Sequence, residues 1–263
     1  MSTTIFTLAG MHRSGTSVIA HWLFQSGFAM GTDLLEAASS NPKGHFEDKE
    51  FLELHRQDLL AKGLHDSGLY GVEGPLRLSV SSKERASQML EKRRSLECWG
   101  WKEPRTVLYL DHWKQILPQL KVVGVFREPE YVAQSLYRRL QKNKWYYTRN
   151  PLKRLAWYLD IDLRPGKWEK VFLDTGSLYN QQLISFADRF PGDTLLLELG
   201  DILESPDRAG KVVASFLGSQ KALVPFQEVF EPSLMTATAK DMQGIPDPVY
   251  QQLIRYKYPL NKT

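Results

Sequence analysis

Cysteine is nearly missing from this sequence: Cys98 is the only one in 263 residues, so no intramolecular disulfide is possible. Long apolar runs are missing too. The longest, Val122–Phe126 and Leu195–Leu197, are far shorter than the roughly 18 residues that a membrane-spanning helix needs. No basic stretch precedes an apolar one near Met1, so we expect no signal peptide. These absences lead us to expect a cytoplasmic protein with no membrane span.

Metal-ligand spacing, internal repeats and low-complexity segments are also absent. The six histidines form no pairs at ligand spacing and have no cysteine cluster beside them, so we expect no metal site. Hydrophobic residues make up 42% and charged residues 24% of the chain, an ordinary globular composition that excludes disorder, collagen and coiled coil. At this length we predict a single domain over residues 1–263.

The charge is small overall but unevenly distributed. The chain has 34 Lys and Arg against 30 Asp and Glu, a net charge of +4. The stretch from Arg127 to Lys170 holds 11 basic and 5 acidic residues, which suits a polyanionic small ligand or an acidic acceptor. Trp145–Tyr147 and its basic neighbours are too short a run to predict a nucleic-acid partner. We interpret them as a loop, and a lid over an acceptor is one of its possible roles.

Strand and helix patterns alternate along the chain. Buried strands are predicted at Ile5–Ala9, Cys98–Lys102, Lys121–Phe126 and Thr194–Leu199. Helices are predicted through Val18–Leu23, at Asp48–Ala61, Lys83–Leu96 and Thr106–Leu117, from Pro129 through Leu140, and at Leu152–Leu163, Leu178–Phe190 and Asp207–Leu217. From Gly218 onward the pattern is mixed and predicts no element. The alternation predicts an α/β fold with a mainly parallel central sheet flanked by helices.

A glycine loop follows the first predicted strand, at the carboxyl edge of the sheet where such folds bind ligands. Gly10 and Gly15 have the spacing of a nucleotide P-loop, but Thr16 stands where that motif requires lysine. Glycines let backbone amides point at an anion, and the helix that follows adds its positive end. Arg13 supplies the charge instead. Its guanidinium fork suits a terminal sulfuryl or phosphoryl group handled without a metal.

A second anion site is predicted after the third strand. Arg127 leaves that strand at its carboxyl end, and Ser135 and Arg139, four residues apart, share a face of the following helix. Two guanidinium groups and a hydroxyl together fit a phosphate. Two separate anion sites are what 3′-phosphoadenosine 5′-phosphosulfate (PAPS) presents, with its 5′-phosphosulfate and its 3′-phosphate.

The sequence resembles the PAPS-dependent sulfotransferases, of the bacterial type and distantly those that act on protein tyrosines. The motifs that carry the resemblance are Gly10–Ser17, the trio Arg127, Ser135 and Arg139, Asn41–Glu47, and Trp99–Arg105. The likeness is strongest over 3–140 and weaker to 217. It implies a P-loop-like three-layer fold, PAPS as donor, and adenosine 3′,5′-bisphosphate and a sulfate ester as products. The donor-binding residues would be Arg13, Ser14, Gly15, Thr16, Ser17, Arg127, Ser135 and Arg139.

Sulfuryl transfer needs a base for the acceptor hydroxyl and positive charge on the leaving oxygen. We expect Glu47 to be the base, because the resembling tyrosylprotein enzymes have a glutamate at the comparable place. His45 is the competitor, since an imidazole titrates near neutrality. Lys102 matches a lysine that stabilises the transferring group in the family, although Glu103 replaces the more usual aspartate. Arg13 would both bind and neutralise the phosphosulfate.

Two other functions remain open on the sequence alone. A small-molecule kinase using ATP and magnesium is disfavoured by Thr16, and a non-catalytic nucleotide-binding module would bind PAPS without turnover. The acceptor is not predicted: a saccharide, lipid, metabolite or peptide hydroxyl, or an amine, is compatible with a basic pocket. No oligomeric state is predicted either.

Overall fold

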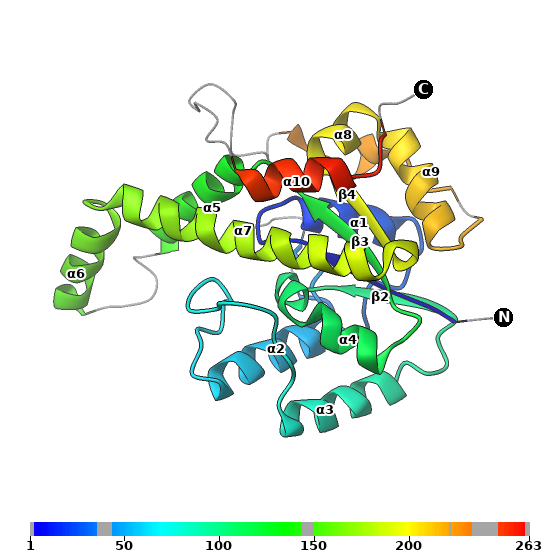
Figure 1. The fold of residues 1–263 in the computed structure, drawn as a ribbon, viewed down its shortest axis with the longest axis horizontal. Helices are drawn as coiled ribbons and strands as arrows, with labels where there is room; N and C mark the ends of the chain where they lie inside the picture. Colours follow the sequence, from blue (N-terminus) through cyan, green and yellow to red (C-terminus); the bar gives the residue numbers. More distant parts are fainter. Residues whose placement is uncertain (1–2, 36–43, 144–149, 221, 233–246, 261–263) are drawn as a thin grey trace.

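The computed structural model describes residues 3–35, 44–143, 150–220, 222–232 and 247–260. Four parallel strands form a central sheet in the order β2-β1-β3-β4 (Figure 1). The strands are β1 (Thr4–Ala9), β2 (Cys98–Lys102), β3 (Lys121–Phe126) and β4 (Thr194–Glu198). The predictions for β2 and β3 are confirmed to the residue, and those for β1 and β4 differ by one residue at one end.

Helices cover both faces of this sheet, which confirms the predicted three-layer α/β fold. One layer contains α1 (Thr16–Gln25), α8 (Leu199–Glu204) and α9 (Pro206–Phe216). The other contains α2 (Lys49–Ala61), α3 (Val80–Glu91), the 3-10 turn η1 (Pro104–Tyr109), α4 (Leu110–Ile116), α5 (Pro129–Asn143), α7 (Pro165–Arg189) and α10 (Pro248–Tyr256). The short α6 (Pro151–Ile161) lies at the far end of α7, and η2 (Pro191–Asp193) and η3 (Phe226–Glu228) are single turns.

Each strand is apolar on both sides because each side faces a separate core. In β1, Ile5 and Ala9 pack toward α2, α4 and α7, whereas Phe6 and Leu8 pack toward α1 and α9. Side chains alternate between the two faces of a strand, so a strand buried on both faces reads as a continuous apolar run. This is why the short runs in the sequence were sufficient to locate the strands.

Several helix boundaries differ from the prediction. The helix predicted at Leu178–Phe190 is the second half of α7, which begins at Pro165; proline fits the first turn of a helix, where its missing N–H is not needed. The helix predicted at Thr106–Leu117 begins as η1 and becomes α-helical only at Leu110.

The C-terminal region, for which no element was predicted, contains α10. The Asp247 carboxylate accepts hydrogen bonds from the amides of Val249 and Tyr250 and so caps this helix, with Pro248 in its first turn. Of the aromatic loop predicted at Asn143–Pro151, residues 144–149 lie outside the described part of the chain. Among the helices described, none is long and apolar enough to cross a lipid bilayer.

Candidate functional site

The glycine loop lies between the end of β1 and the start of α1, as predicted. A Cβ on Gly10 would lie 2.2 Å from the carbonyl oxygen of Val125 in β3, so only glycine fits there. Gly15 has a φ of +90° and packs against Leu199 of α8. Arg13 also adopts a left-handed conformation, with a φ of +70°, which is uncommon for a residue with a side chain and is often found at functional sites.

The loop meets the second predicted anion site directly. Arg13 Nε donates a hydrogen bond of 2.9 Å to Ser135 Oγ, across 122 residues of sequence. Ser135 is buried in α5, and the exposed Arg139 follows it by one turn of the same helix. The two predicted clusters therefore face each other and do not lie on opposite sides of the molecule.

Arg127 completes this group at the end of β3. Its guanidinium carbon lies 4.6 Å from the centre of the Tyr131 ring, a contact that orients the side chain. Burial, with Arg139 and Arg127 nearby, lowers the pKa of Arg13. The pKa of Arg127 is lowered by burial as well. Positive charge is thus concentrated here, and no carboxylate among the described residues forms an ion pair with Arg13, so an anion would relieve the repulsion.

Lys102 forms the second half of the site. It ends β2, is 2% exposed, and its Nζ donates to three oxygens. These are Glu47 Oε1 at 2.7 Å, Ser17 Oγ at 3.3 Å and the His45 carbonyl oxygen at 3.3 Å. Ser17 lies in the first turn of α1, so Lys102 joins the glycine loop to the segment that carries Glu47 and His45.

Glu47 is held in place through its neighbour Asp48, which caps α2. The Asp48 carboxylate accepts from the amides of Glu50 and Phe51, and from the buried Arg93 Nη2 at 2.8 Å. The Glu47 carbonyl accepts from the Leu35 amide at 2.7 Å. Glu47 is only 8% exposed, so its carboxylate has a fixed place beside Lys102.

His45 lies two residues before Glu47, on the same segment. Its carbonyl oxygen accepts a hydrogen bond of 3.3 Å from Lys102 Nζ. Burial lowers the pKa of the His45 imidazole, and Lys102 acts in the same direction while Glu47 opposes it. A lowered pKa keeps the ring neutral at pH 7, so His45 also meets the electrostatic requirement for a base.

Glu103 and Arg105 belong to a buried structural network behind the site. Arg105 Nη1 pairs with Glu103, and Arg105 Nε donates to the Asp66 carbonyl oxygen at 2.7 Å. The other Glu103 oxygen lies 2.7 Å from His55 Nδ1. Because the Trp113 indole donates to His55 Nε2 at 3.0 Å, the Nδ1 atom carries the proton that Glu103 accepts.

The structure also identifies contacts that the sequence analysis missed. His12 in the glycine loop directs Nε2 toward the Ser67 carbonyl at 3.2 Å, and Tyr131 stacks on Arg127. The spacing of Arg127 and Tyr131, four residues apart at a helix start, is a signal that could have suggested the stacking. No local signal connects Arg93 with Asp48, 45 residues apart.

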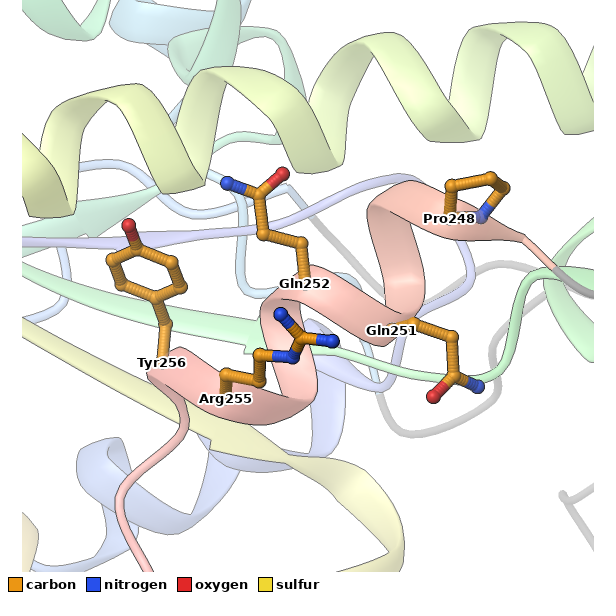
Figure 2. A pocket seen from close by; sticks show the side chains of 5 residues that line it. All are labelled: Pro248, Gln251, Gln252, Arg255 and Tyr256. Atoms are coloured by element: carbon orange, nitrogen blue, oxygen red, sulfur yellow. The ribbon is translucent and has the colours of Figure 1, made fainter.

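The predicted donor-binding residues thus lie in one loop and in the elements around it. Ser14 and Thr16 are buried within it, Arg13 reaches α5, and Ser17 reaches Lys102. A hollow on the surface of α10 contains none of the predicted residues; Figure 2 shows its lining, Pro248, Gln251, Gln252, Arg255 and Tyr256. Within the described ranges, no three His, Cys, Asp or Glu side chains come together as a metal site would require.

Comparisons with known proteins agree with this architecture. The sulfotransferase of Alicyclobacillus acidocaldarius matches with a TM-score of 0.52 at 15% identity, over 89% of this chain and 88% of its own. The sulfotransferase domain of the Synechococcus PCC 7002 olefin synthase has a TM-score of 0.52 at 13% identity, over 97% and 95%. A Mycobacterium avium sulfotransferase has a TM-score of 0.50 at 13% identity, over 83% of this chain and 64% of its own.

At these identities the likeness establishes the fold: the chain has the α/β fold of the sulfotransferases. No protein-family model matches the sequence. No curated protein matches it significantly.

Proposed function

We propose that this chain, built on the fold of the sulfotransferases, is a PAPS-dependent sulfotransferase. The observation that carries the proposal is the hydrogen bond from Arg13 Nε to Ser135 Oγ, which joins the two anion motifs around one loop. A donor with a phosphosulfate at one end and a 3′-phosphate at the other needs two such sites within the length of one adenosine. A P-loop kinase instead needs a lysine where this chain has Thr16.

In this proposal the loop amides, Ser14, Gly15, Thr16 and Ser17 bind the 5′-phosphosulfate, with Arg13 supplying the positive charge. Arg127, Ser135 and Arg139 bind the 3′-phosphate. The start of α1 adds the favourable end of its dipole to the first site. The closeness of the Arg13, Arg127 and Arg139 guanidinium groups supports this assignment, because it favours a ligand with several negative charges.

The transfer step assigns one task to Glu47 and another to Lys102. The acceptor oxygen attacks sulfur in line, its proton passes to a Glu47 carboxylate oxygen, and the bond from sulfur to the bridging oxygen breaks. The electron pair of that bond stays on the phosphate of adenosine 3′,5′-bisphosphate, where Lys102 stabilises the negative charge that develops. The 2.7 Å contact between Lys102 and Glu47 supports these roles, because it places both groups at one point beside Ser17.

The competitor for the base is His45, and the acceptor stays open among saccharide, lipid, metabolite and peptide hydroxyls and amines. A cytoplasmic location stays a prediction, supported by the single cysteine and the lack of a long apolar run.

Calorimetry with adenosine 3′,5′-bisphosphate and with ATP and magnesium tests the donor. We expect binding of the bisphosphate, a strong loss of affinity in Arg13→Gln and Arg127→Gln, and wild-type affinity in Arg94→Gln, whose side chain is 81% exposed three residues after α3. Tight binding of ATP with magnesium, and none of the bisphosphate, would overturn the proposal and favour the kinase alternative.

Turnover separates an enzyme from a binding module and distinguishes the two bases. We expect labelled PAPS to be consumed with acceptors from a metabolite extract, and Glu47→Gln to lose at least a hundredfold in rate while still binding the bisphosphate. Unchanged turnover in Glu47→Gln together with loss in His45→Gln would move the base to His45. Binding without turnover under all conditions would identify a non-catalytic module.

A further inference from the structure

Exposed apolar side chains are concentrated on α6 and at Leu163, two residues after its end. Ten large hydrophobic side chains are exposed among the described residues, and five of them lie within twelve positions. These five are Leu152, Leu155, Tyr158, Leu159 and Leu163, with exposures of 76%, 54%, 45%, 46% and 59%. Scattered single leucines on a surface need no explanation, but a cluster of this density marks an interaction site.

Three of the four leucines lie on one side of the helix. Leu152, Leu155 and Leu159 have the three- and four-residue spacing that places side chains along one face, and Leu163 lies two residues beyond the end of the helix. All four side chains are exposed, and α6 itself lies at the end of α7, away from the sheet (Figure 1). The cluster of these four leucines is called the leucine stripe below.

Two side-chain hydrogen bonds attach the C-terminal end of α6 to the rest of the protein. Tyr137 Oη donates to the Ile161 carbonyl at 2.9 Å, and Trp168 Nε1 donates to the Asp160 carbonyl at 3.0 Å, while Ile161 is itself buried. An isolated helix of 11 residues is marginally stable in water, and in proteins such helices depend on packing of their apolar face. The leucine stripe therefore requires a surface on which to pack.

The net charge of the segment around α6 indicates which kind of partner could cover the leucine stripe. Residues 142–170 contain eight Lys or Arg against three Asp or Glu, a net +5 in a chain whose total is +4. A second copy would bring an equally positive segment against the first, and the two would repel. At the surface, Arg164 and Lys167 pair with Asp160, and Lys170 pairs with Asp174; the three cationic side chains are 68%, 50% and 76% exposed. The occupant is therefore anionic and apolar at once.

We propose that α6 docks on an anionic lipid bilayer, with the leucine stripe inserted into the interface and the surrounding cations on the lipid headgroups. A convex helix that carries a line of leucines matches a deformable apolar layer, whereas an acidic protein would need a complementary groove. The basic residues add long-range attraction to a negatively charged membrane surface. This inference goes beyond the proposed transfer reaction, and binding to vesicles needs neither donor nor acceptor, so the two proposals fail separately.

Co-sedimentation of the full chain with vesicles tests this docking. One set of vesicles contains phosphatidylcholine alone, and the other contains phosphatidylcholine with phosphatidylglycerol. We expect binding to the second set at low salt, and a marked weakening as sodium chloride is raised, because salt screens the attraction. The double variant Leu152→Ser, Leu155→Ser should bind at least tenfold more weakly, since it removes two side chains from the inserted face.

Leu60→Ser is the matched control, because Leu60 is 51% exposed on α2, far from α6 in sequence and in Figure 1. It should bind vesicles like the wild type. Leu163→Ser, outside the helix, is a second variant if the double variant does not fold, and it should also weaken binding. Equal binding by wild type and stripe variants, or equal binding to both vesicle types, overturns the proposal.

Two further outcomes would identify a different binding partner for the leucine stripe. A stable dimer in analytical ultracentrifugation that Leu152→Ser dissociates would assign the leucine stripe to a second copy. Absence of vesicle binding, with stripe-dependent binding to a purified acidic protein, would assign it to a protein partner. Both results contradict docking on a bilayer.

Discussion

Removing the buried guanidinium of Arg93 should destabilise the fold strongly. Arg93 is completely buried, and its Nη2 donates 2.8 Å hydrogen bonds to Asp48 and to Thr32 Oγ1. Its Nη1 donates to the Met89 carbonyl at 2.8 Å and pairs with Glu50 at 2.8 Å. Arg93→Met keeps an apolar stem over the Phe51 ring but leaves the Asp48 carboxylate, which is also fully buried, without its cation.

The magnitude follows from what Asp48 retains. Loss of one partner of a buried ion pair costs about 3–5 kcal/mol. Asp48 still accepts from the amides of Thr32, Glu50 and Phe51, which stabilise its negative charge. We therefore expect the lower end of the range, a loss of about 3 kcal/mol in the free energy of unfolding.

Urea unfolding followed by tryptophan fluorescence measures this loss, with Arg94→Met as the control. Arg94 pairs with Glu91 at 3.3 Å with both side chains exposed, and exposed pairs of this kind contribute little. The unfolding midpoint of Arg93→Met should fall by about 1 M urea or more, while that of Arg94→Met should hardly move. An Arg93→Met protein within about 1 kcal/mol of wild type would refute the reasoning, because it would show that Asp48 needs no cation.

Two other predictions concern acid stability and the glycine loop. Burial opposes ionisation of Asp58, but hydrogen bonds from Lys62, Ser79 and Ser82 outweigh it and lower the pKa of Asp58 to about 2. Because the pKa of Asp58 is lower in the folded than in the unfolded chain, where it is near 4, its ionised form stabilises the fold above pH 4, and this stability is lost as the pH falls toward 2. In Asp58→Asn the urea midpoint should therefore fall less steeply with acid than in the wild type. An unchanged slope would contradict this. Gly10→Ala should lower the melting temperature, because its Cβ would lie 2.2 Å from the Val125 carbonyl oxygen. Gly74→Ala is the control and should not lower it, because a Cβ there has no neighbour within 4 Å. Equal melting temperatures for the two variants would contradict the close packing at Gly10.

Local patterns were sufficient for the sheet and for most helices. The strands are short, doubly buried apolar runs, so β2 and β3 were predicted with correct bounds. The helix start at Pro129 was predicted correctly, but the starts at two other prolines were not. Pro165 begins α7, and Pro248 begins α10 after the capping residue Asp247, although a proline preceded by aspartate is itself a helix-start signal.

For the candidate site, the sequence predicted which side chains matter but not what holds them. Arg13 contacts Ser135, and Lys102 contacts Glu47; the motifs singled out these residues but not their contacts, and their roles stay predictions. The support of Glu47 by Asp48 and Arg93 was not predictable, because it depends on residues far apart in sequence whose partnership only the fold creates. Long-range pairs of this type leave no periodic signal in a single chain.

One strand-to-helix connection serves both ends of the site: Arg13 reaches toward α5, and Ser17, four residues later, toward Lys102. Arg13 and Gly15 are both in the left-handed conformation within this stretch, so a substitution here that changes the backbone would move the residues at both ends of the site. Affinity for a nucleotide and speed of reaction would then change together under mutation here. A substitution that alters one without the other would have to lie outside this connection, at residues such as Arg139 or Glu47 to which the proposal gives a single task.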